Sequence, residues 1–261
     1  MSFEGKVALV TGGSSGIGRA TVMRLARDGC AVGVLGHGAE TVEKVVEEVT
    51  KAGGRALALV ADVADEGGMR AAVDRLVGVW GRLDLIFANA GINGVWAPID
   101  EIAPEEWDRT IATNLRGTYL TLHLGVPHLK RAGGGAAVIT ASVNGTRVFS
   151  NAGATAYSAT KAAQVAMGQM LALELAKFRI RVNVVCPGSI ETAIDRSTEQ
   201  RSPDVAGEPV NFPEGHVPLT GGEPGTAEDV AELVAFLLSD RARHITGTPV
   251  WIDGAESLLV G

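Results

Sequence analysis

A tyrosine and a lysine stand four residues apart in the segment ATAYSATKAAQVA, residues 154–166. Small and apolar residues recur here with helical spacing, which predicts a helix over Ala156–Lys177 and places Tyr157 and Lys161 on one face. A free phenol has a pKa of about 10, and a neighbouring ammonium group favours the phenolate and lowers that pKa. Such a pair could exchange a proton as a general acid or base. Taken alone, the same spacing also fits an ordinary pair of side chains on a helix surface.

The segment TGGSSGIG, residues 11–18, indicates a second kind of chemistry. It follows an apolar run and opens a helical pattern. In that position, backbone N–H groups and the helix dipole face an incoming pyrophosphate, and side chains in place of the glycines would block its approach. The segment therefore predicts a dinucleotide-binding turn, although a glycine-rich turn without a ligand has the same composition.

The elements that position these residues alternate along the chain. Seven short, almost wholly apolar runs predict strands: Lys6–Val10, Ala31–Leu35, Arg55–Val60, Leu83–Ala88, Ala136–Thr140, Arg181–Cys186 and Thr248–Ile252. Helical patterns lie between them: Ala20–Asp28, Glu40–Ala52, Glu66–Trp80, Pro104–Lys130, Ala156–Lys177 and Ala227–Ser239. Strands that are apolar on both faces are typical of a parallel sheet covered by helices and connected by right-handed crossovers. We therefore predict an α/β, doubly wound fold with a seven-stranded parallel sheet and helices on both faces.

Length and composition indicate one substantial core. The chain has 261 residues, of which 46% are hydrophobic, and no linker separates two apolar regions, so we expect residues 1–261 to form a single domain. Residues 189–225 contain five prolines and follow the end of a strand, where ligands of open α/β sheets bind. We expect this segment to be a substrate-binding loop or lid within the domain.

Charge and cysteine content limit the function classes. The net charge of −7 gives no electrostatic reason to expect nucleic acid or an anionic membrane as a partner. Cys30 and Cys186 lack a CxxC neighbour, which favours buried free thiols in a reducing compartment. The first glycine loop comes too early for a signal peptide, and the apolar stretch Val165–Leu175 is too short to span a bilayer. We expect a soluble, cytoplasmic protein without a catalytic metal, because the five histidines lack paired ligand spacing.

Several short motifs occur together and in a fixed order. They are TGGSSGIG, Asn89-Ala90-Gly91, Asn114, Ser142, Tyr157-x-x-x-Lys161 and Pro187-Gly188-x-Ile190-x-Thr192. Together they resemble the short-chain dehydrogenase/reductase (SDR) family in its compact, single-domain form, and the closing segment GTPVWIDG extends the resemblance over the whole chain. The resemblance implies a Rossmann-type, NAD(P)-binding domain that transfers hydride between a nicotinamide and a CH–OH group.

The same resemblance implies a role for each of four catalytic residues. Tyr157 would exchange the proton with substrate, while Lys161 would tune the tyrosine and hold the nicotinamide ribose hydroxyls. Ser142 would hydrogen-bond the substrate oxygen from the end of a strand. It lies fifteen residues before Tyr157, slightly more than the usual family spacing, so Asn144 is a competing candidate. Asn114 would bend its helix and hold a water that links the lysine to solvent.

The resemblance also implies which residues line the cofactor. Asp62 would accept a hydrogen bond from the adenine amino group, although it could instead be a helix N-terminal acid, a role that Asp65 could also fill. Pro187 opens a segment that would fix the nicotinamide carboxamide. The full expected set is Gly12, Ser14, Ser15, Gly16, Ile17, Gly18, His37, Asp62, Val63, Asn89, Ala90, Gly91, Tyr157, Lys161, Pro187, Gly188, Ile190 and Thr192.

The second expected strand bears on the choice of nicotinamide cofactor. Folds selective for NAD usually carry an acid about 20 residues past the glycine loop, where it bonds the ribose 2′-hydroxyl. Gly36 occupies that place here, and His37 could donate a hydrogen bond to a 2′-phosphate. Glu40, one turn away, could instead take the role of the acid. We predict NADP(H) in preference to NAD(H).

The expected activity is the interconversion of a secondary alcohol and a ketone, as in 3-oxoacyl or other carbonyl reductases or in polyol and sugar dehydrogenases. Residues 94–98 and the lid would shape the pocket, with Trp96 and Phe149 either as an apolar wall or as core. A dinucleotide-binding sensor without turnover is the alternative, but it has no need of Tyr157, Lys161 and Ser142 together. Related epimerases and dehydratases need a larger C-terminal domain. The family implies a homotetramer, and the apolar tail at residues 258–260 suits burial in one.

Overall fold

The computed structural model describes residues 2–192, 194, 197–208 and 217–260. Its centre is a seven-stranded sheet in the order β3-β2-β1-β4-β6-β7-β9, with every neighbouring pair parallel. The strands are β1 (Val7–Thr11), β2 (Ala31–Gly36), β3 (Arg55–Val60), β4 (Leu85–Ala88), β6 (Gly135–Thr140), β7 (Ile180–Pro187) and β9 (Pro249–Ile252). The predicted doubly wound fold with seven parallel strands is confirmed.

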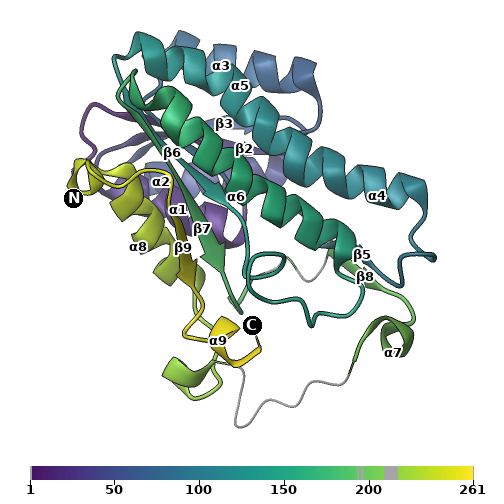
Figure 1. Ribbon diagram of the computed structural model, residues 1–261. Helices are drawn as coiled ribbons and strands as arrows, with labels where there is room; N and C mark the ends of the chain where they lie inside the picture. Colours follow the sequence, from purple (N-terminus) through teal and green to yellow (C-terminus); the bar gives the residue numbers. More distant parts are fainter. Residues whose placement is uncertain (1, 193, 195–196, 209–216, 261) are drawn as a thin grey trace.

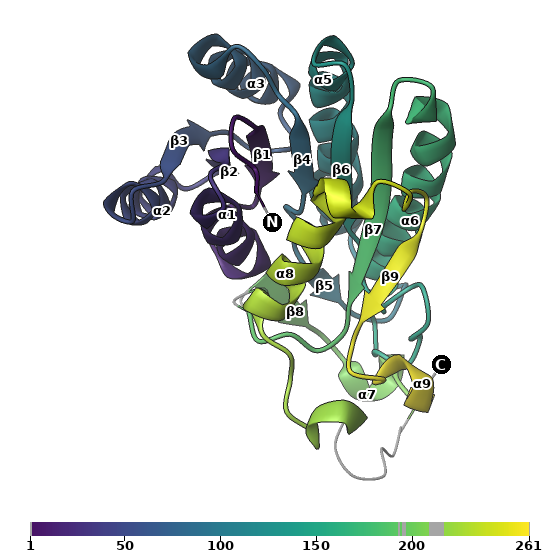
Figure 2. The same cartoon turned by 90° about the vertical axis from the view of Figure 1, so that its left-hand side faces the viewer.

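Helices cover both faces of this sheet (Figure 1). Figure 2 shows α1 (Gly16–Arg27), α2 (Ala39–Lys51) and α8 (Ala227–Leu238) on one face. The other face carries α3 (Glu66–Trp80), α4 (Pro104–Thr110), α5 (Gly117–Arg131) and α6 (Thr155–Ala176). The described residues also form several short elements, among them α7 (Pro203–Ala206), the 3₁₀ turns η3 (Pro218–Thr220) and η4 (Asp240–Ala242), and α9 (Ser257–Val260).

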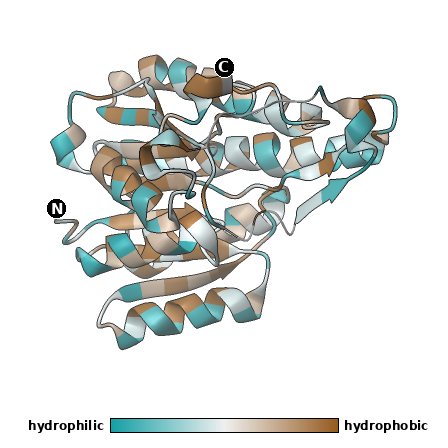
Figure 3. Ribbon diagram, turned by 90° about the horizontal axis from the view of Figure 1, so that it is seen from below, coloured by the Kyte–Doolittle hydropathy of each residue, from teal (hydrophilic) through white to brown (hydrophobic). Residues whose placement is uncertain are grey.

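Each face of the sheet contributes to its own core layer. On β1, Val7 and Leu9 pack into the layer beneath α3, α5 and α6, whereas Ala8 and Val10 pack into the layer beneath α1, α2 and α8. Because successive strand residues point to opposite faces, a strand covered on both sides must be apolar throughout. Figure 3 shows the result, with mainly hydrophobic inner strands and helices of mixed hydropathy.

The expected helix Pro104–Lys130 is interrupted in its middle. Residues Ile111–Arg116 form a π-helical segment, labelled η1, between α4 and α5. A π segment adds one residue to the turn, and such bulges occur frequently at functional sites. Helical periodicity alone does not reveal it, because the flanking α-helical turns continue on either side.

A second, two-stranded parallel sheet was not predicted. It pairs β5 (Gly94–Trp96) with β8 (Thr198–Gln200). Each strand has three residues, too few for an alternating pattern to stand out from a loop. The second strand lies in the segment 189–225 expected to be a loop or lid.

The ends of that segment meet at one point. The Glu191 N–H donates to the Gly225 carbonyl at 2.9 Å, and the Gly225 N–H donates to the Ser189 carbonyl at 3.0 Å. The segment therefore leaves and rejoins the domain beside the end of β7.

Candidate functional site

The sequence-predicted site residues gather at the carboxyl edge of the large sheet. The glycine loop follows β1, Asn89 follows β4, Ser142 follows β6 and Gly188 follows β7. In a parallel sheet these strand ends lie on one edge, which is where open α/β folds bind ligands. Helix α6 brings Tyr157 and Lys161 to the same region.

Tyr157 and Lys161 lie together in the first turns of α6. The Lys161 Nζ is 5.3 Å from the centre of the Tyr157 ring, and both side chains are buried. Lys161 is 3% exposed and donates a hydrogen bond to the Thr140 carbonyl at 2.9 Å. Burial lowers the pKa of Lys161 to about 8, because a charged ammonium loses its hydration there. The pair is therefore not a surface pair.

Ser142 and Asn144 are the two candidates for the residue that contacts the substrate oxygen. The Ser142 Oγ accepts a hydrogen bond from the Asn144 N–H at 3.1 Å, which orients the hydroxyl. The Asn144 Oδ1 instead accepts from the Asn151 Nδ2 at 2.6 Å. A hydroxyl that accepts one bond can still donate its hydrogen, and the Asn144 amide N–H groups can donate as well, so these contacts leave both candidates open.

Asn114 lies within the π-helical segment and is fully buried. Its Oδ1 accepts from the Ile92 N–H at 2.8 Å, and its Nδ2 donates to the Ile92 carbonyl at 2.9 Å and to the Thr160 Oγ1 at 3.2 Å. A Cβ on Gly91 would lie 3.2 Å from the Asn114 Oδ1 and 3.7 Å from the Lys161 Nζ. Asn114 thus ties the segment after β4 to the helix that carries the lysine.

At three positions of the glycine loop, a side chain would crowd neighbouring atoms of the protein itself. A Cβ on Gly18 would lie 2.0 Å from the Gly12 carbonyl oxygen, and one on Gly12 would lie 3.0 Å from the Ala90 Cα. A Cβ on Gly13 would lie 3.1 Å from a methyl group of Val34. These glycines let the loop, α1 and the neighbouring strands approach closely, whether or not a ligand is bound.

The start of α1 has the features of an anion site. Its N-cap residue, Ser15, makes no side-chain capping bond, and its first turn holds no acidic residue. By contrast, Asp65 caps α3 by accepting from the N–H groups of Gly67 and Gly68. Orphan N–H groups and a helix dipole at an open sheet edge suit a phosphate, so these residues fit the dinucleotide that the fold implies.

The segment after β4 is bonded to the glycine loop. The Thr11 Oγ1 accepts from the N–H groups of Asn89 and Ala90 at 3.0 and 3.2 Å. The Asn89 side chain donates to the Thr11 carbonyl and accepts from the Thr140 Oγ1. Three neighbouring strand ends are thereby held in register beneath the site.

The expected adenine and ribose contacts lie after β2 and β3. Asp65 fills the helix-capping role, which leaves the exposed Asp62 free of it, while Val63 is buried against Gly117. His37 is exposed at the end of β2. A Cβ on Gly36 would lie 3.1 Å from the Ser14 Oγ and 3.0 Å from a Val42 methyl group, so an acidic side chain does not fit there without displacement.

The residues after β7 approach both the glycine loop and the C-terminal segment. A Cβ on Gly16 would lie 3.3 Å from Thr192, and the Gly188 N–H donates to the Ile252 carbonyl at 3.1 Å. Pro187 ends β7, and Ile190 forms a bridge with Gly225 where the two ends of the segment 189–225 meet. Ile17 packs against the core layer under α1 and α8.

The two apolar candidates for the substrate wall differ in position. Trp96 is partly buried, with its ring centre 6.2 Å from that of Tyr157, whereas Phe149 is 76% exposed. Trp96 therefore lies beside the candidate catalytic tyrosine. Phe149 belongs to the surface rather than the core.

Other residues bond to the candidate catalytic residues or lie beside them, although the sequence analysis did not single them out. The Thr160 hydroxyl donates to the Tyr157 carbonyl at 2.6 Å, and the Gln164 Nε2 donates to the Asn114 carbonyl at 2.9 Å. The Asn93 Nδ2 donates to the Thr198 Oγ1 in the segment 189–225 at 2.7 Å. The Thr160 bond lies within one turn of α6, whereas the Gln164 bond joins α6 to the π-helical segment, a contact that follows from the packed fold and that no local motif marks.

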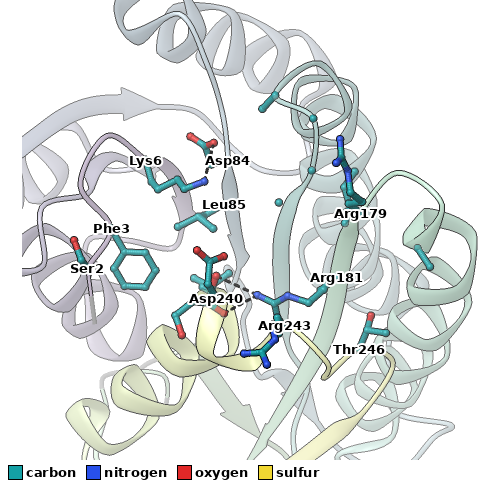
Figure 4. A pocket seen from close by; sticks show the side chains of 18 residues that line it. Ser2, Phe3, Lys6, Asp84, Leu85, Arg179, Arg181, Asp240, Arg243 and Thr246 are labelled. Atoms are coloured by element: carbon teal, nitrogen blue, oxygen red, sulfur yellow. Dashed lines mark hydrogen bonds and ion pairs between the residues drawn. The ribbon is translucent and has the colours of Figure 1, made fainter.

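A cavity of 630 Å³ lies at the opposite edge of the sheet (Figure 4). Three of its charged side chains, Arg181, Lys6 and Asp84, take part in contacts that hold the fold. Arg181 donates to the Leu237, Leu238 and Ser239 carbonyls at the end of α8, and Lys6 lies 3.8 Å from Asp84. The cavity is separate from the candidate site.

Two further observations concern the described residues only. None of their helices combines the length and apolar content needed to cross a bilayer. Nor do three or more histidine, cysteine or acidic side chains gather there in a way that could hold a metal ion.

The chain belongs to the short-chain dehydrogenase family, whose family model ("short chain dehydrogenase") matches residues 6–203. It is an oxidoreductase of that family. Among its relatives, the cyclohexanol dehydrogenase of Acinetobacter sp. (strain SE19) is 39% identical over 97% of this chain and 95% of that protein. The levodione reductase of Leifsonia aquatica is 36% identical over 98% of this chain and 95% of that protein.

Several solved structures are similar to this chain, and they too are of reductases or dehydrogenases. The crystal structure of a 3-ketoacyl-ACP reductase from Sinorhizobium meliloti 1021 superposes with a TM-score of 0.94 and 60% identity, over 97% of this chain and 99% of that chain. A Brucella melitensis 3-ketoacyl-(acyl-carrier-protein) reductase, 32% identical, was solved with NADH (TM-score 0.86; 98% of this chain, 100% of that chain). A Burkholderia cenocepacia J2315 short-chain dehydrogenase, 36% identical, was solved with NADP (TM-score 0.85; 98% and 99%).

Proposed function

We propose that this protein is an NADP(H)-dependent oxidoreductase that interconverts a secondary alcohol and a ketone through Ser142, Tyr157 and Lys161. The observation that carries the proposal is the buried Tyr157–Lys161 pair, with 5.3 Å between the Lys161 Nζ and the Tyr157 ring centre, at the sheet edge where the glycine loop opens. A nucleotide-binding sensor would need the glycine loop but not a buried ammonium beside a phenol.

The roles follow from the chemistry of each side chain. The Tyr157 phenol passes a proton to the carbonyl oxygen during reduction and takes it back during oxidation. Ser142 donates a hydrogen bond to that oxygen as charge develops on it. The Lys161 ammonium favours the phenolate and holds the ribose hydroxyls, and Asn114 supports proton relay from Lys161 to solvent. The nicotinamide, when bound, supplies or accepts the hydride.

Trp96 and the relatives favour an apolar ketone as substrate. The two relatives above are named cyclohexanol dehydrogenase and levodione reductase, and an indole beside the phenol offers a flat apolar surface to a ring such as that of cyclohexanol. A 3-oxoacyl thioester is the second candidate, because the 60% identical structure is a 3-ketoacyl-ACP reductase. Among the described residues, no specific contact favours a sugar or polyol.

A steady-state screen tests the proposal. Cyclohexanone, a short linear ketone, a 3-oxoacyl thioester and a sugar ketose are offered with NADPH and with NADH, and oxidation of the cofactor is followed by absorbance. We expect NADPH oxidation with the ring ketone above the rate without substrate. Nucleotide binding without turnover of any compound would support the sensor instead.

The cofactor preference gives a separate prediction. We expect NADPH to be used more efficiently than NADH, and His37→Ala to raise the KM for NADPH by about tenfold, the effect of losing one hydrogen bond to a charged phosphate. The KM for NADH should not change, because NADH lacks that phosphate. His244→Ala, at an exposed histidine near the opposite edge of the sheet, is the matched control. Equal losses with both cofactors would contradict the assignment of His37.

We further propose that residues 1–261 act as one domain, with residues 189–225 as its substrate loop, and that four copies assemble. Helices α5 and α6 expose Tyr119, Met170 and Leu173, the last 84% exposed, which suits burial between copies. Light scattering should then give four times the chain mass of 27.0 kDa.

The free, buried thiols of Cys30 and Cys186 suit a reducing cytoplasm.

A further inference from the structure

The described part of the substrate loop is attached to the site by the small sheet. Strand β8 pairs with β5 in the register Gly94↔Thr198, Val95↔Glu199 and Trp96↔Gln200. Figure 1 shows the two strands side by side beyond the end of α6. Trp96, the residue beside Tyr157, is thus itself part of the attachment.

Asn93 lies at the start of this attachment and is buried. Its side-chain Nδ2 donates to the Thr198 Oγ1 at 2.7 Å, and its N–H donates to the Ser197 Oγ at 3.0 Å. Its carbonyl accepts from the indole Nε1 of Trp96 at 3.2 Å. One residue therefore bonds both to the loop and to the aromatic wall.

The position of Trp96 is set by its neighbours on both sides. Gly94 has a φ of +72°, and a Cβ there would lie 2.3 Å from the Thr110 Oγ1, so the strand enters close to α4. The Arg201 N–H donates to the Trp96 carbonyl at 2.9 Å. A shift of β8 would therefore move the backbone of Trp96 and the indole facing Tyr157.

Arg201 continues the attachment toward α4. Its guanidinium forms an ion pair with Glu106 and donates to the Glu101 carbonyl at 3.0 Å. The next residue, Ser202, has a φ of +44°, which a residue with a side chain rarely adopts. The Asn93–Thr198 bond is part-buried, with Asn93 itself only 6% exposed, whereas the Arg201–Glu101 bond is exposed.

We propose that Asn93 and Thr198 are positioning residues that determine which ketones the enzyme accepts. Their hydrogen bond holds the substrate loop on Trp96 and so sets the space between the indole and the Tyr157 hydroxyl. The proposal rests on the proposed carbonyl reduction for its kinetic consequence. The attachment of the loop can be measured without turnover.

Kinetics of matched variants test the consequence. Asn93→Ala and Thr198→Val each remove the bond, and each should raise the KM for cyclohexanone by about fivefold, the usual effect of one lost hydrogen bond, with kcat and the KM for NADPH within about twofold of wild type. Thr198→Ser keeps the hydroxyl and should stay near wild type. The double variant should be no worse than either single one, because both remove the same bond. An unchanged KM in both single variants, or equal damage from Thr198→Ser and Thr198→Val, would overturn the proposal.

Proteolysis tests the attachment independently of activity. Trypsin cuts after Arg201 only when β8 leaves its partners, and mass spectrometry identifies the 202–261 fragment. We expect this cut to be about fivefold faster in Asn93→Ala and Thr198→Val. Thr50→Val, which removes a hydroxyl bonded to the Val46 carbonyl on α2, is the control and should match wild type. Equal rates in all variants would overturn the proposal even if the enzyme is active. If no ketone is turned over, the proposed function fails while this measurement still decides whether Asn93 holds the loop.

Discussion

Tyr157→Phe is expected to lower kcat for ketone reduction by about a thousandfold, the typical contribution of a positioned proton donor. The substitution removes only the hydroxyl. The ring stays in its buried place beside Trp96, with ring centres 6.2 Å apart, so fold and nucleotide affinity should be retained. Steady-state rates with NADPH, together with nucleotide affinity from fluorescence titration, measure both effects.

The chain contains its own matched control for this experiment. Tyr119, the other of its two tyrosines, lies half-exposed on α5 and stacks on His123 with ring centres 5.2 Å apart. Tyr119→Phe should leave kcat unchanged. If Tyr157→Phe keeps most of the wild-type rate, the phenol is not the proton donor and the proposed mechanism is wrong.

Lys161→Met is expected to lower kcat by about a hundredfold or more, because the phenol loses the cation that favours its ionised form. The same variant should be more stable than wild type at pH 7. Lowering the pKa of Lys161 from 10.5 to about 8 corresponds to a cost of roughly 3 kcal/mol for keeping the charge buried. Loss of this charge-assisted bond to the Thr140 carbonyl offsets roughly 1.5–3 kcal/mol of that gain. Urea unfolding should therefore show a net gain of up to about 1.5 kcal/mol.

The pH dependence of that gain distinguishes it from a packing effect. Below pH 8 both the folded and the unfolded chain hold the lysine proton, so wild type carries the full cost. Between about pH 8 and 10.5 the folded chain releases the proton first and the unfolded chain binds more protons, so wild-type stability rises with pH. The advantage of Lys161→Met should shrink over that interval. Lys51→Met, at a lysine that is 77% exposed on α2, should show no such trend. A gain that is constant with pH would contradict the buried-charge explanation.

Part of the site was predictable because it depends on local spacing. Residues four apart share a helix face, which is why Tyr157 and Lys161 could be paired from the sequence and lie together in α6. The glycine loop is likewise contiguous, and its place between a strand and a helix follows from hydrophobic periodicity. The sequence also left two assignments open, and the structure shows a contact relevant to each. Asp65, rather than Asp62, caps α3. Of the candidates Ser142 and Asn144, the latter accepts a hydrogen bond from Asn151 through its side-chain oxygen.

Local patterns could not reveal contacts between distant segments. Asn114 bonds to Thr160, 46 positions away, and Asn93 bonds to Thr198, 105 positions away. The three-residue strands β5 and β8 have no signal of their own and exist because the folded chain brings them together. The π-helical segment at Asn114 is similarly hidden within a continuous helical pattern.

The sequence by itself therefore determined the order of strands and helices along the chain, the glycine turn, and the helix face that Tyr157 and Lys161 share. Each of these is encoded within a few consecutive turns or residues. Only the tertiary structure decided how deeply the lysine is buried, which aromatic side chain lies beside the phenol and where strand β8 pairs with β5. Those properties depend on desolvation and on hydrogen bonds between segments far apart in the chain, and neither exists until the two core layers have packed against the sheet.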